Sequence, residues 1–508
     1  MCALNPTFAG TAIAKLALMG KNTNLLGKSW VQIPLAFIVV LAIQTWGIST
    51  PSLWADEVAT ISASTRSLGH LFSMLQVIDA VHGTYYLLMH FWAKIFGLAP
   101  FWLRLPSAIA VTGAVVLTWR VARSQFGARV GWFALVLAAA LPRLTWAATE
   151  GRSYGIDALI GITVLYLFLK ANQAIGRRAL GYWIAYAVFL SFGIDLFIYM
   201  VLFAGAHGIW LLRKNRDAFG NWLYATIAAV LGSLVVIVWG LIEKGQLGWL
   251  PKLSDRTILE VFVGQAFWLD PALALLACGL ILALMVGARR PGFVEAPQET
   301  NIIGLLTISV LLPPAIILAY SAFGDSVYDS RYFTYAAPMV AVLLALAIDR
   351  LFTRRLALLA LIVAVALSVQ PYIYFRTPES KLTSWGPLAA KVEAVSHSGD
   401  GILYSDFKSI SPSLSRVAIG YPEEFLKVHD LTQAAAYYNS PGLYPKRLPI
   451  DDVVVQLPSY KRILVLGATK FMANYQHIND LLTTNGFSLK RQIKVADYWI
   501  SVFTLDKP

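Results

Sequence analysis

The chain has 508 residues, of which 57% are hydrophobic and only 14% are charged. Soluble globular proteins contain about 25% charged residues, so this composition excludes an ordinary soluble protein and indicates a polytopic membrane protein. The net charge of +13 comes mainly from short Lys and Arg clusters between apolar runs. That pattern is typical of membrane orientation signals and gives no support for nucleic-acid binding. The two cysteines, Cys2 and Cys278, support neither a disulfide framework nor a cysteine-based metal site.

Residues 1–30 precede the first long apolar run and are interpreted as a cytoplasmic N-terminal segment. The run that follows is longer than a signal-peptide core, and similar runs come after it, so we expect an uncleaved anchor. Segments of roughly 17 to 25 apolar residues can cross a bilayer. They predict eleven transmembrane helices, at about 31–50, 103–120, 130–147, 155–171, 180–195, 197–212, 221–243, 266–288, 301–321, 332–348 and 356–374.

A further apolar segment at 84–96 is short and carries His90 and Lys94, which favours an interfacial or re-entrant helix. If it does not cross, every basic cluster falls on one side of the membrane. We therefore predict a multi-pass protein of the inner (plasma) membrane with a cytoplasmic N-terminus and an extracytoplasmic C-terminus. The clusters are Lys15, Lys21 and Lys28; Arg120, Arg123 and Arg129; Lys170, Arg177 and Arg178; Arg213, Lys214 and Arg216; Arg289 and Arg290; and Arg350, Arg354 and Arg355.

The pattern changes after Phe375, where short strands begin to alternate with helices. We expect strands at 401–404, 452–455, 462–466 and 499–505 and helices at 388–395 and 477–484, which together predict a layered α/β domain. The predicted fold class is therefore mainly α. It comprises a helical membrane domain over 31–375, with a first external loop at 51–102, and an extracytoplasmic α/β domain over 376–508.

Two adjacent carboxylates, Asp56 and Glu57, stand just beyond the first apolar run, where a membrane helix emerges from lipid. Ionisable groups at such a boundary are costly unless they are used, so we interpret this pair as the chemical centre. The alternative is a solvated acidic turn that ends a helix.

Other ionisable and aromatic side chains are predicted on the same external face. Carboxylates can accept a proton or hold a metal, whereas guanidinium groups bind phosphate through two parallel hydrogen bonds. Together they indicate transfer chemistry on a phosphorylated substrate at the membrane surface. The residues are Asp79, His82, Tyr85, Arg104, Glu150, Arg152, Tyr154, Arg331 and Tyr332.

Several of these residues also have a structural interpretation. Arg104 and Arg331 could extend to lipid headgroups. Glu150 and Arg152 could pair with each other at a helix end. His82 has no partner spacing that would define a metal site.

Five elements, taken in order, resemble the motifs of GT-C fold membrane glycosyltransferases. The resemblance is to the protein O-mannosyltransferase and lipid A aminoarabinose transferase relatives (glycosyltransferase families 39 and 83) and spans roughly residues 30 to 375. Gly83 and Thr84 depart from the family pattern, in which a proline pair follows the histidine. The elements are Asp56-Glu57; Asp79-x-x-His82-Gly83-x-Tyr85-Tyr86; Leu103-Arg104-Leu105-Pro106-Ser107; Glu150-Gly-Arg152-Ser-Tyr154; and Arg331-Tyr332 with Pro338.

The resemblance implies a glycosyltransferase that takes a mannose- or arabinose-type sugar from a polyprenyl-phosphate donor on the extracytoplasmic face. Asp56 would be the general base of an inverting transfer. Glu57 would orient the acceptor or hold a divalent cation, Mg²⁺ or Mn²⁺, if one is used. Arg331, Arg152 and Arg104 would stabilise the leaving phosphate, and the sugar or acceptor would be positioned by Asp79, His82, Tyr85, Glu150, Tyr154 and Tyr332.

The acceptor on this interpretation is an envelope glycan, lipid or protein, and the tail after Phe375 is expected to dock the acceptor or a partner. Two other classes stay open from the residues alone. One is a transporter or flippase for a polyprenyl lipid or polysaccharide, although such proteins usually place charges near the bilayer midplane. The other is a non-catalytic envelope assembly protein.

Overall fold

The computed structural model describes residues 29–268, 270–289, 297–406 and 414–506. The predicted N-terminal segment up to Lys28, with Cys2 and the first basic cluster, lies outside the described residues. The chain divides into two compact units. We call Met1–Ile48 with Arg104–Phe375 the helical unit, and Ser49–Leu103 with Arg376–Pro508 the mixed unit.

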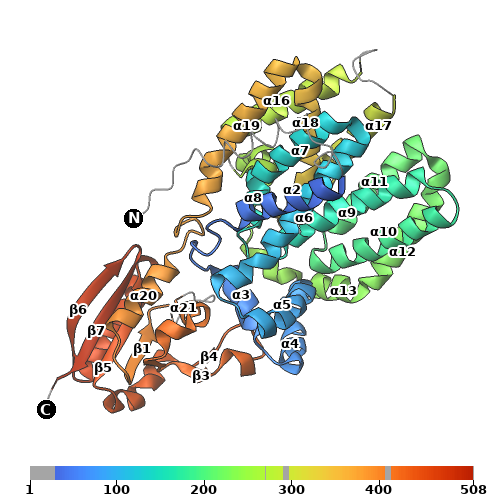
Figure 1. Cartoon of the computed structure of the whole chain (residues 1–508). Coiled ribbons are helices and arrows are strands. Elements are labelled where there is room, and N and C mark those ends of the chain that lie inside the picture. Colours follow the sequence, from blue (N-terminus) through green and yellow to red (C-terminus); the bar gives the residue numbers. More distant parts are fainter. Residues whose placement is uncertain (1–28, 269, 290–296, 407–413, 507–508) are drawn as a thin grey trace. The chain divides into compact units, whose positions relative to one another are not determined.

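Apolar helices, most of them long, build the helical unit (Figure 1). Each of the eleven predicted spans overlaps one of these helices or a pair separated by a short break. The helices are α2 (Ser29–Thr45), α6 (Pro100–Phe126), α7 (Ala128–Ala140), α8 (Pro142–Ala147), α9 (Tyr154–Gln173), α10 (Arg177–Leu196), α11 (Met200–Lys214), α12 (Phe219–Gly232), α13 (Leu234–Ile242), α15 (Gln265–Phe267), α16 (Pro271–Gly287), α17 (Pro297–Phe323), α18 (Ala337–Leu351) and α19 (Arg354–Tyr374).

Six stretches in the described residues are long and apolar enough to cross a membrane, or up to eight if each of two bent pairs is one span. Val31–Thr45 and Ala128–Ala140 are shorter apolar helices. The span that ends in α18 is completely buried within the protein. This fits its sequence, because a helix that is apolar on every side belongs in the centre of a bundle.

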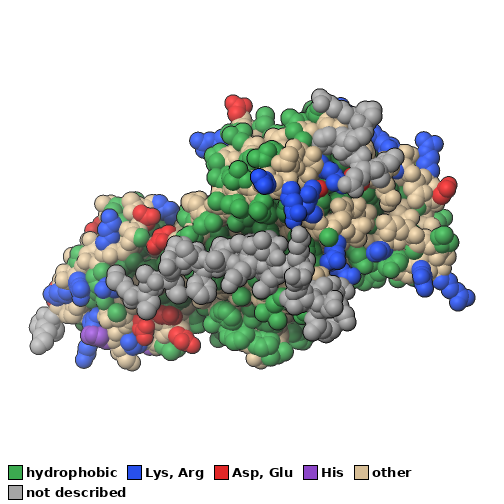
Figure 2. Space-filling model, turned by 45° about the horizontal axis from the view of Figure 1, so that its top comes forward, with side chains coloured by type: hydrophobic (Ala, Val, Ile, Leu, Met, Phe, Trp, Pro, Cys, Tyr) green, Lys and Arg blue, Asp and Glu red, His purple; other side chains and the backbone are tan. Residues whose placement is uncertain are grey.

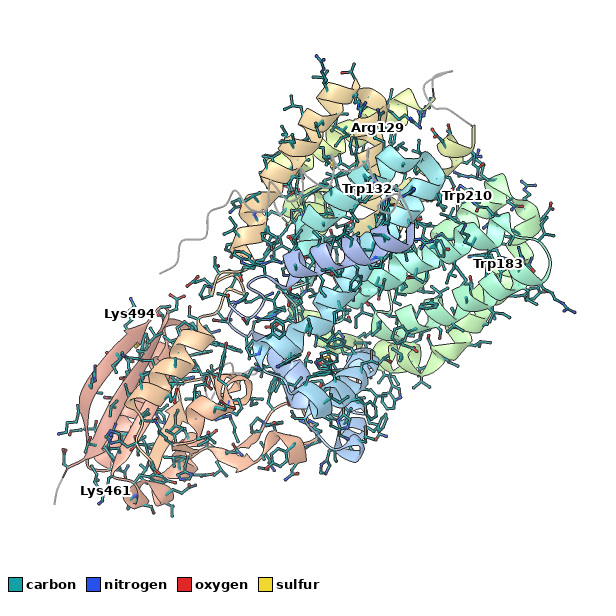
Figure 3. The ribbon with its side chains drawn as sticks, viewed as in Figure 1. Arg129, Trp132, Trp183, Trp210, Lys461 and Lys494 are labelled. Carbon is teal, nitrogen blue, oxygen red and sulfur yellow. The ribbon has the colours of Figure 1, made fainter. Side chains whose placement is uncertain are left out.

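The basic clusters that are described gather at one end of this unit. Arg129 on α7, which Figure 3 labels, pairs with Asp349 on α18. Asp349 also binds the adjacent Arg350 (3.1 Å), which in turn binds Glu299 on α17 (2.8 Å). Three further cations, Arg213, Lys214 and Arg289, line a single groove of about 530 Å³. At their opposite ends, α9 begins at Tyr154, and α18 begins at Ala337, directly after the 3-10 helix Ser330–Ala336 that contains Arg331.

Hydrophobic side chains cover broad areas of the surface in Figure 2. Examples on the helical unit are Val235 and Leu275, whose exposed fractions are 70% and 76%. Exposed apolar area on this scale is unfavourable in water but matches a lipid environment.

In the mixed unit, a short helical loop accompanies a sheet domain (Figure 1). The loop contains α3 (Ala55–Ser64), α4 (Leu68–Leu75), the 3-10 turn η2 (Ala80–His82) and α5 (Gly83–Phe96). The sheet has the strand order β2-β1-β5-β7-β6. Its strands are β1 (Asp400–Tyr404), β2 (Val428–Asp430), β5 (Arg462–Ala468), β6 (Phe487–Val495) and β7 (Tyr498–Leu505), with a separate pair β3 (Gln433–Ala435) and β4 (Lys446–Arg447).

This sheet is mixed. β1 pairs in parallel with β2 and β5, and β7 pairs antiparallel with β5 and β6. The helix α20 (Trp385–Val395) runs along one face, and α22 (Met472–Thr484) connects β5 to β6. The core beneath these elements includes Leu403, Val465, Ile478 and Phe503. The predicted strands at 401–404, 462–466 and 499–505 and both predicted helices are confirmed.

The strand predicted at 452–455 is wrong, because residues Ile450–Ser459 form a 3-10 helix, η9. The buried residues Ile450, Val453 and Leu457 recur every three or four positions, whereas Val455 is 86% exposed. That period is helical, so the run of valines misled the prediction. Strand β6 was missed because it is mostly exposed and carries charged residues such as Lys494, which Figure 3 labels.

Candidate active site

Asp56 and Glu57 lie in the first turn of α3. They begin a helix, so the alternative of a turn that ends one is wrong. The amide groups at a helix N-terminus carry partial positive charge, and this stabilises carboxylates in the first turn. The two side chains differ in exposure: Glu57 is completely buried, and Asp56 is partly exposed. Asp56 is therefore the member of the pair that can reach a substrate.

The C-terminal sheet domain holds α3 at both of its ends. Before the helix, the Leu53 amide donates to the Tyr421 hydroxyl (2.8 Å). After it, the guanidinium of Arg66 donates to the carbonyls of Ser440 and Gly442 (2.6 Å each). Arg66 is 1% exposed, and its Nε also donates to the Ser62 carbonyl (3.1 Å). The orientation of the acidic helix therefore depends on residues more than 350 positions later in the chain.

The second predicted element, Asp79 to Tyr86, packs beside α3. The Tyr86 hydroxyl donates to Asp79 Oδ2 (2.7 Å), and the ring of His82 lies 6.0 Å from that of Tyr86. Asp79 has a left-handed backbone conformation (φ 61°), which aspartate tolerates better than most residues. The structure thus brings Asp79 and His82 together. Tyr85 is buried on α5, the helix that also carries Tyr86. His90 was not predicted as part of this element, and its Nδ1 lies 3.0 Å from the Ser64 carbonyl.

Arg104 belongs to the helical unit and is completely buried near the start of α6. Its Nη1 donates to the Ile48 carbonyl (2.7 Å) at the end of the first apolar run. A buried side chain with this partner does not extend to lipid headgroups, so that alternative is wrong. A role in phosphate binding stays a prediction.

Glu150, Arg152 and Tyr154 lie at the break between α8 and α9, and all three are buried. The Arg152 carbonyl accepts a hydrogen bond from Ser107 Oγ (2.9 Å) on α6. Gly155 packs against the same residue: a Cβ at this position would lie 2.7 Å from the Ser107 carbonyl oxygen. The Glu-x-Arg-x-Tyr element is therefore joined to the helix that carries Arg104.

Arg331 and Tyr332 lie in the 3-10 helix η6 (Ser330–Ala336). Asp329 precedes it: its Oδ1 accepts a hydrogen bond from the Arg331 amide (3.0 Å), and its Oδ2 forms an ion pair with Arg331 Nε (3.0 Å). The guanidinium also lies 5.4 Å from the ring of Trp249, in the 3-10 helix η4 (Glu243–Trp249). Since Asp329 fixes both the backbone and the side chain, Arg331 is an oriented cation, and this favours ligand binding over a flexible headgroup contact.

Two arginines that the sequence interpretation did not use have structural importance. Arg66 follows the end of α3 by two residues, and Arg143 stands alone in the apolar run that contains α7 and α8. Arg143 is 1% exposed and lies against Trp146 and Trp268. An arginine within a membrane-helix pattern was the signal that could have identified it.

The predicted residues fall into two sets. Within the mixed unit, the structure brings Asp79, His82 and Tyr85 together next to α3, which carries Asp56 and Glu57. Within the helical unit, Arg104, Arg152 and their neighbours adjoin through Ser107. Among the described residues, no three His, Cys, Asp or Glu side chains form a group that could hold a metal ion. Glu57 as a metal ligand stays a prediction.

Residues 84–240 match the family model described as dolichyl-phosphate-mannose-protein mannosyltransferase. The whole chain resembles the crystal structure of ArnT from Cupriavidus metallidurans bound to undecaprenyl phosphate, with a TM-score of 0.60 at 12% identity over 94% of this chain and 98% of that one. The chain has the GT-C fold. The predicted resemblance and fold class are thereby confirmed, and the chain is a multi-pass membrane protein.

Other GT-C structures are also similar to this chain. The apo form of the same ArnT matches with a TM-score of 0.61, 12% identity and coverage of 93% of this chain and 97% of that one. The Archaeoglobus fulgidus oligosaccharyltransferase in complex with Zn and sulfate matches with a TM-score of 0.48, 14% identity and coverage of 85% and 67%. No curated protein matches the sequence. The family match agrees with the predicted enzyme class, a glycosyltransferase.

Proposed function

We propose that this protein transfers a mannose- or arabinose-type sugar from a polyprenyl-phosphate donor to an envelope glycan, lipid or protein on the extracytoplasmic face. The GT-C fold over 94% of the chain is the observation that carries this proposal. The matched family model is named for a lipid-phosphate mannose donor, and the ArnT crystal structure contains undecaprenyl phosphate. Both support a lipid-linked donor here.

Asp56 acts as the general base in this proposal. It takes the proton from the acceptor hydroxyl as the hydroxyl oxygen attacks the anomeric carbon. The bond from that carbon to the phosphate oxygen breaks, the configuration inverts, and polyprenyl phosphate leaves with the bonding electron pair. The partial exposure of Asp56 supports this role, because a base must come within hydrogen-bonding distance of the acceptor. Buried Glu57 orients the acceptor, or holds a divalent cation if the reaction uses one.

The arginines stabilise the phosphate as negative charge develops on it. Arg331 is the strongest candidate, because Asp329 orients it and its side chain remains 14% exposed. Fixed cations at such a position act mainly on the transition state. Arg152 and Arg104 assist on this proposal, and Asp79, His82, Tyr85, Glu150, Tyr154 and Tyr332 position the sugar or acceptor.

The orientation follows from charge. The Lys and Arg clusters at one end of the helical unit face the cytoplasm on this proposal, since positive loops are retained there. The starts of α9 and α18, with Arg152 and Arg331 before them, then face outward. On this proposal the reaction takes place on the extracytoplasmic face, and the donor sugar reaches that face on its polyprenyl phosphate.

Purified protein in liposomes provides the test. It would be incubated with synthetic polyprenyl-phosphate mannose or arabinose and with envelope acceptors, and mass spectrometry would detect the glycosylated acceptor and the released polyprenyl phosphate. We expect equimolar formation of both products. Movement of the intact donor between leaflets without cleavage would overturn the proposal in favour of a flippase.

A further inference from the structure

Arg143 is a buried cation near the N-terminus of α8, immediately after Pro142. Only 1% of the residue is exposed. None of the carboxylates in the described part of the chain lies within ion-pair distance of its guanidinium. A buried charge without an ionic partner is expensive, and an apolar residue of similar volume would often be at least as stable there. Arg143 therefore needs an explanation beyond packing.

The hydrogen bonds of Arg143 reach two other segments. Its Nε donates to the Gln265 carbonyl (2.8 Å), and its Nη2 donates to the Gly264 carbonyl. The same Nη2 donates to Ser330 Oγ (3.2 Å). Ser330 immediately precedes Arg331 and begins η6. One guanidinium thus joins α8, the α15 segment and the turn that bears the proposed phosphate ligand.

Two tryptophans keep this guanidinium in place. It lies 4.9 Å from the ring of Trp146 and 4.7 Å from that of Trp268, and the two rings stack with their centroids 4.7 Å apart. Trp268 has a left-handed backbone (φ 49°), a strained conformation that its surroundings must maintain. The ring of Trp146 also lies 5.0 Å from that of Tyr154. The cluster therefore contacts residues on or next to two of the predicted site elements.

We propose that Arg143 is a positioning residue that sets the placement of Arg331 for the donor phosphate. This inference rests on the proposed function. Asp329 fixes Arg331 relative to its own turn, and Arg143 fixes the turn itself through Ser330. A lysine retains the charge but cannot reproduce the fork of donors that binds two carbonyls and a hydroxyl together.

The test compares Arg143→Lys with Arg350→Lys. Arg350 is the matched control because it also bonds side chains on two helices, at the opposite end of α18. Loss of a charge-assisted hydrogen bond to Ser330 should raise the donor KM of Arg143→Lys roughly tenfold, with the acceptor KM unchanged. Ser330→Ala, which keeps both carbonyl contacts, should cause a smaller rise in the same constant. Arg350→Lys should lower the unfolding temperature without changing the donor KM.

The rate of amide hydrogen exchange in residues 328–336 provides a second measurement, which does not depend on enzyme activity. We expect faster exchange there in Arg143→Lys and not in Arg350→Lys. Equal effects of the two variants on exchange and on donor KM would overturn the positioning role, as would an unchanged donor KM in Arg143→Lys. An inactive wild type would instead refute the proposed function, and the exchange result would still decide whether Arg143 holds the turn.

Discussion

The acidic helix α3 and the cationic turn η6 are held in different ways. Hydrogen bonds to two distant backbone carbonyls and to a tyrosine hydroxyl fix α3, and all three acceptors belong to the C-terminal sheet domain. The turn η6 depends on its neighbour Asp329 and on Arg143, inside the helical unit. The base and the phosphate ligand of the proposed reaction can therefore be disturbed separately, by changes in different parts of the chain.

This difference also gives the tail a role besides the acceptor or partner docking that the sequence predicts for it. The residues around 440 and 421 hold α3, so removal of the tail would release the helix that carries Asp56. Point variants in these contacts are more informative than a deletion, because they leave the sheet domain in place.

Asp56→Asn should have the largest effect. Asparagine preserves the shape of the side chain but cannot accept the proton, so the transfer rate should fall by about 10² to 10⁴. The assay is sugar transfer from the lipid-linked donor, with donor binding measured in parallel. Donor binding and the unfolding temperature should stay near the wild-type values. Wild-type transfer by Asp56→Asn would remove this residue from the mechanism.

Arg331→Gln tests the role of the cationic turn η6. Loss of one preorganised group at the developing charge should lower kcat by about 10² to 10³. Arg256, an exposed arginine of the short helix Asp255–Leu259 in the same unit, provides the control as Arg256→Gln. If the two glutamine variants transfer sugar equally well, Arg331 does not stabilise the leaving phosphate.

Arg66→Lys should act on the acidic helix alone. A lysine cannot donate to both the Ser440 and Gly442 carbonyls in the geometry of a guanidinium. We expect roughly a tenfold loss in kcat, from the charge-assisted hydrogen bonds that are lost, with donor binding unchanged. Arg447→Lys is the matched control, since Arg447 pairs with Asp430 (3.0 Å) within the sheet domain. A rise in the donor KM of Arg66→Lys would contradict the claim that α3 and η6 can be disturbed separately.

The sequence predicted much of this organisation, because hydropathy, charge clusters and ordered motifs are local signals. The spans, the change after Phe375 and the position of Asp56 beyond the first span all follow from such signals. The contact of Arg66 with Ser440 is different, because it joins residues far apart and neither shows a local pattern. Arg143 is recognisable from the sequence as a charged residue within an apolar run, but its contact with Ser330 is seen only in the structure.

Glycine-to-alanine substitutions at two positions compare the packing near Arg152 with the packing against α3. Each adds only one methyl group. A Cβ at Gly155 would lie 2.7 Å from the Ser107 carbonyl oxygen, which is backbone and cannot rotate away. Gly155→Ala should therefore force α9 away from α6 and cost about 1 to 3 kcal/mol of unfolding free energy, in the usual range for overpacking. It should also impair donor use, because Arg152 lies in the same turn.

At Gly420 an added Cβ would meet Val58 Cγ2 at 3.0 Å and Leu53 Cδ1 at 3.2 Å, which are ends of side chains. These atoms can shift by small rotations, so Gly420→Ala should cost less than about 1 kcal/mol. Any change in transfer should appear in kcat and not in donor binding, since Val58 lies on α3 beside Glu57. Thermal unfolding and donor titration of both alanine variants provide the measurement. A larger destabilisation by Gly420→Ala than by Gly155→Ala would contradict this order. It would mean that the contact between the C-terminal domain and α3 is less able to adjust than the contact between α9 and α6.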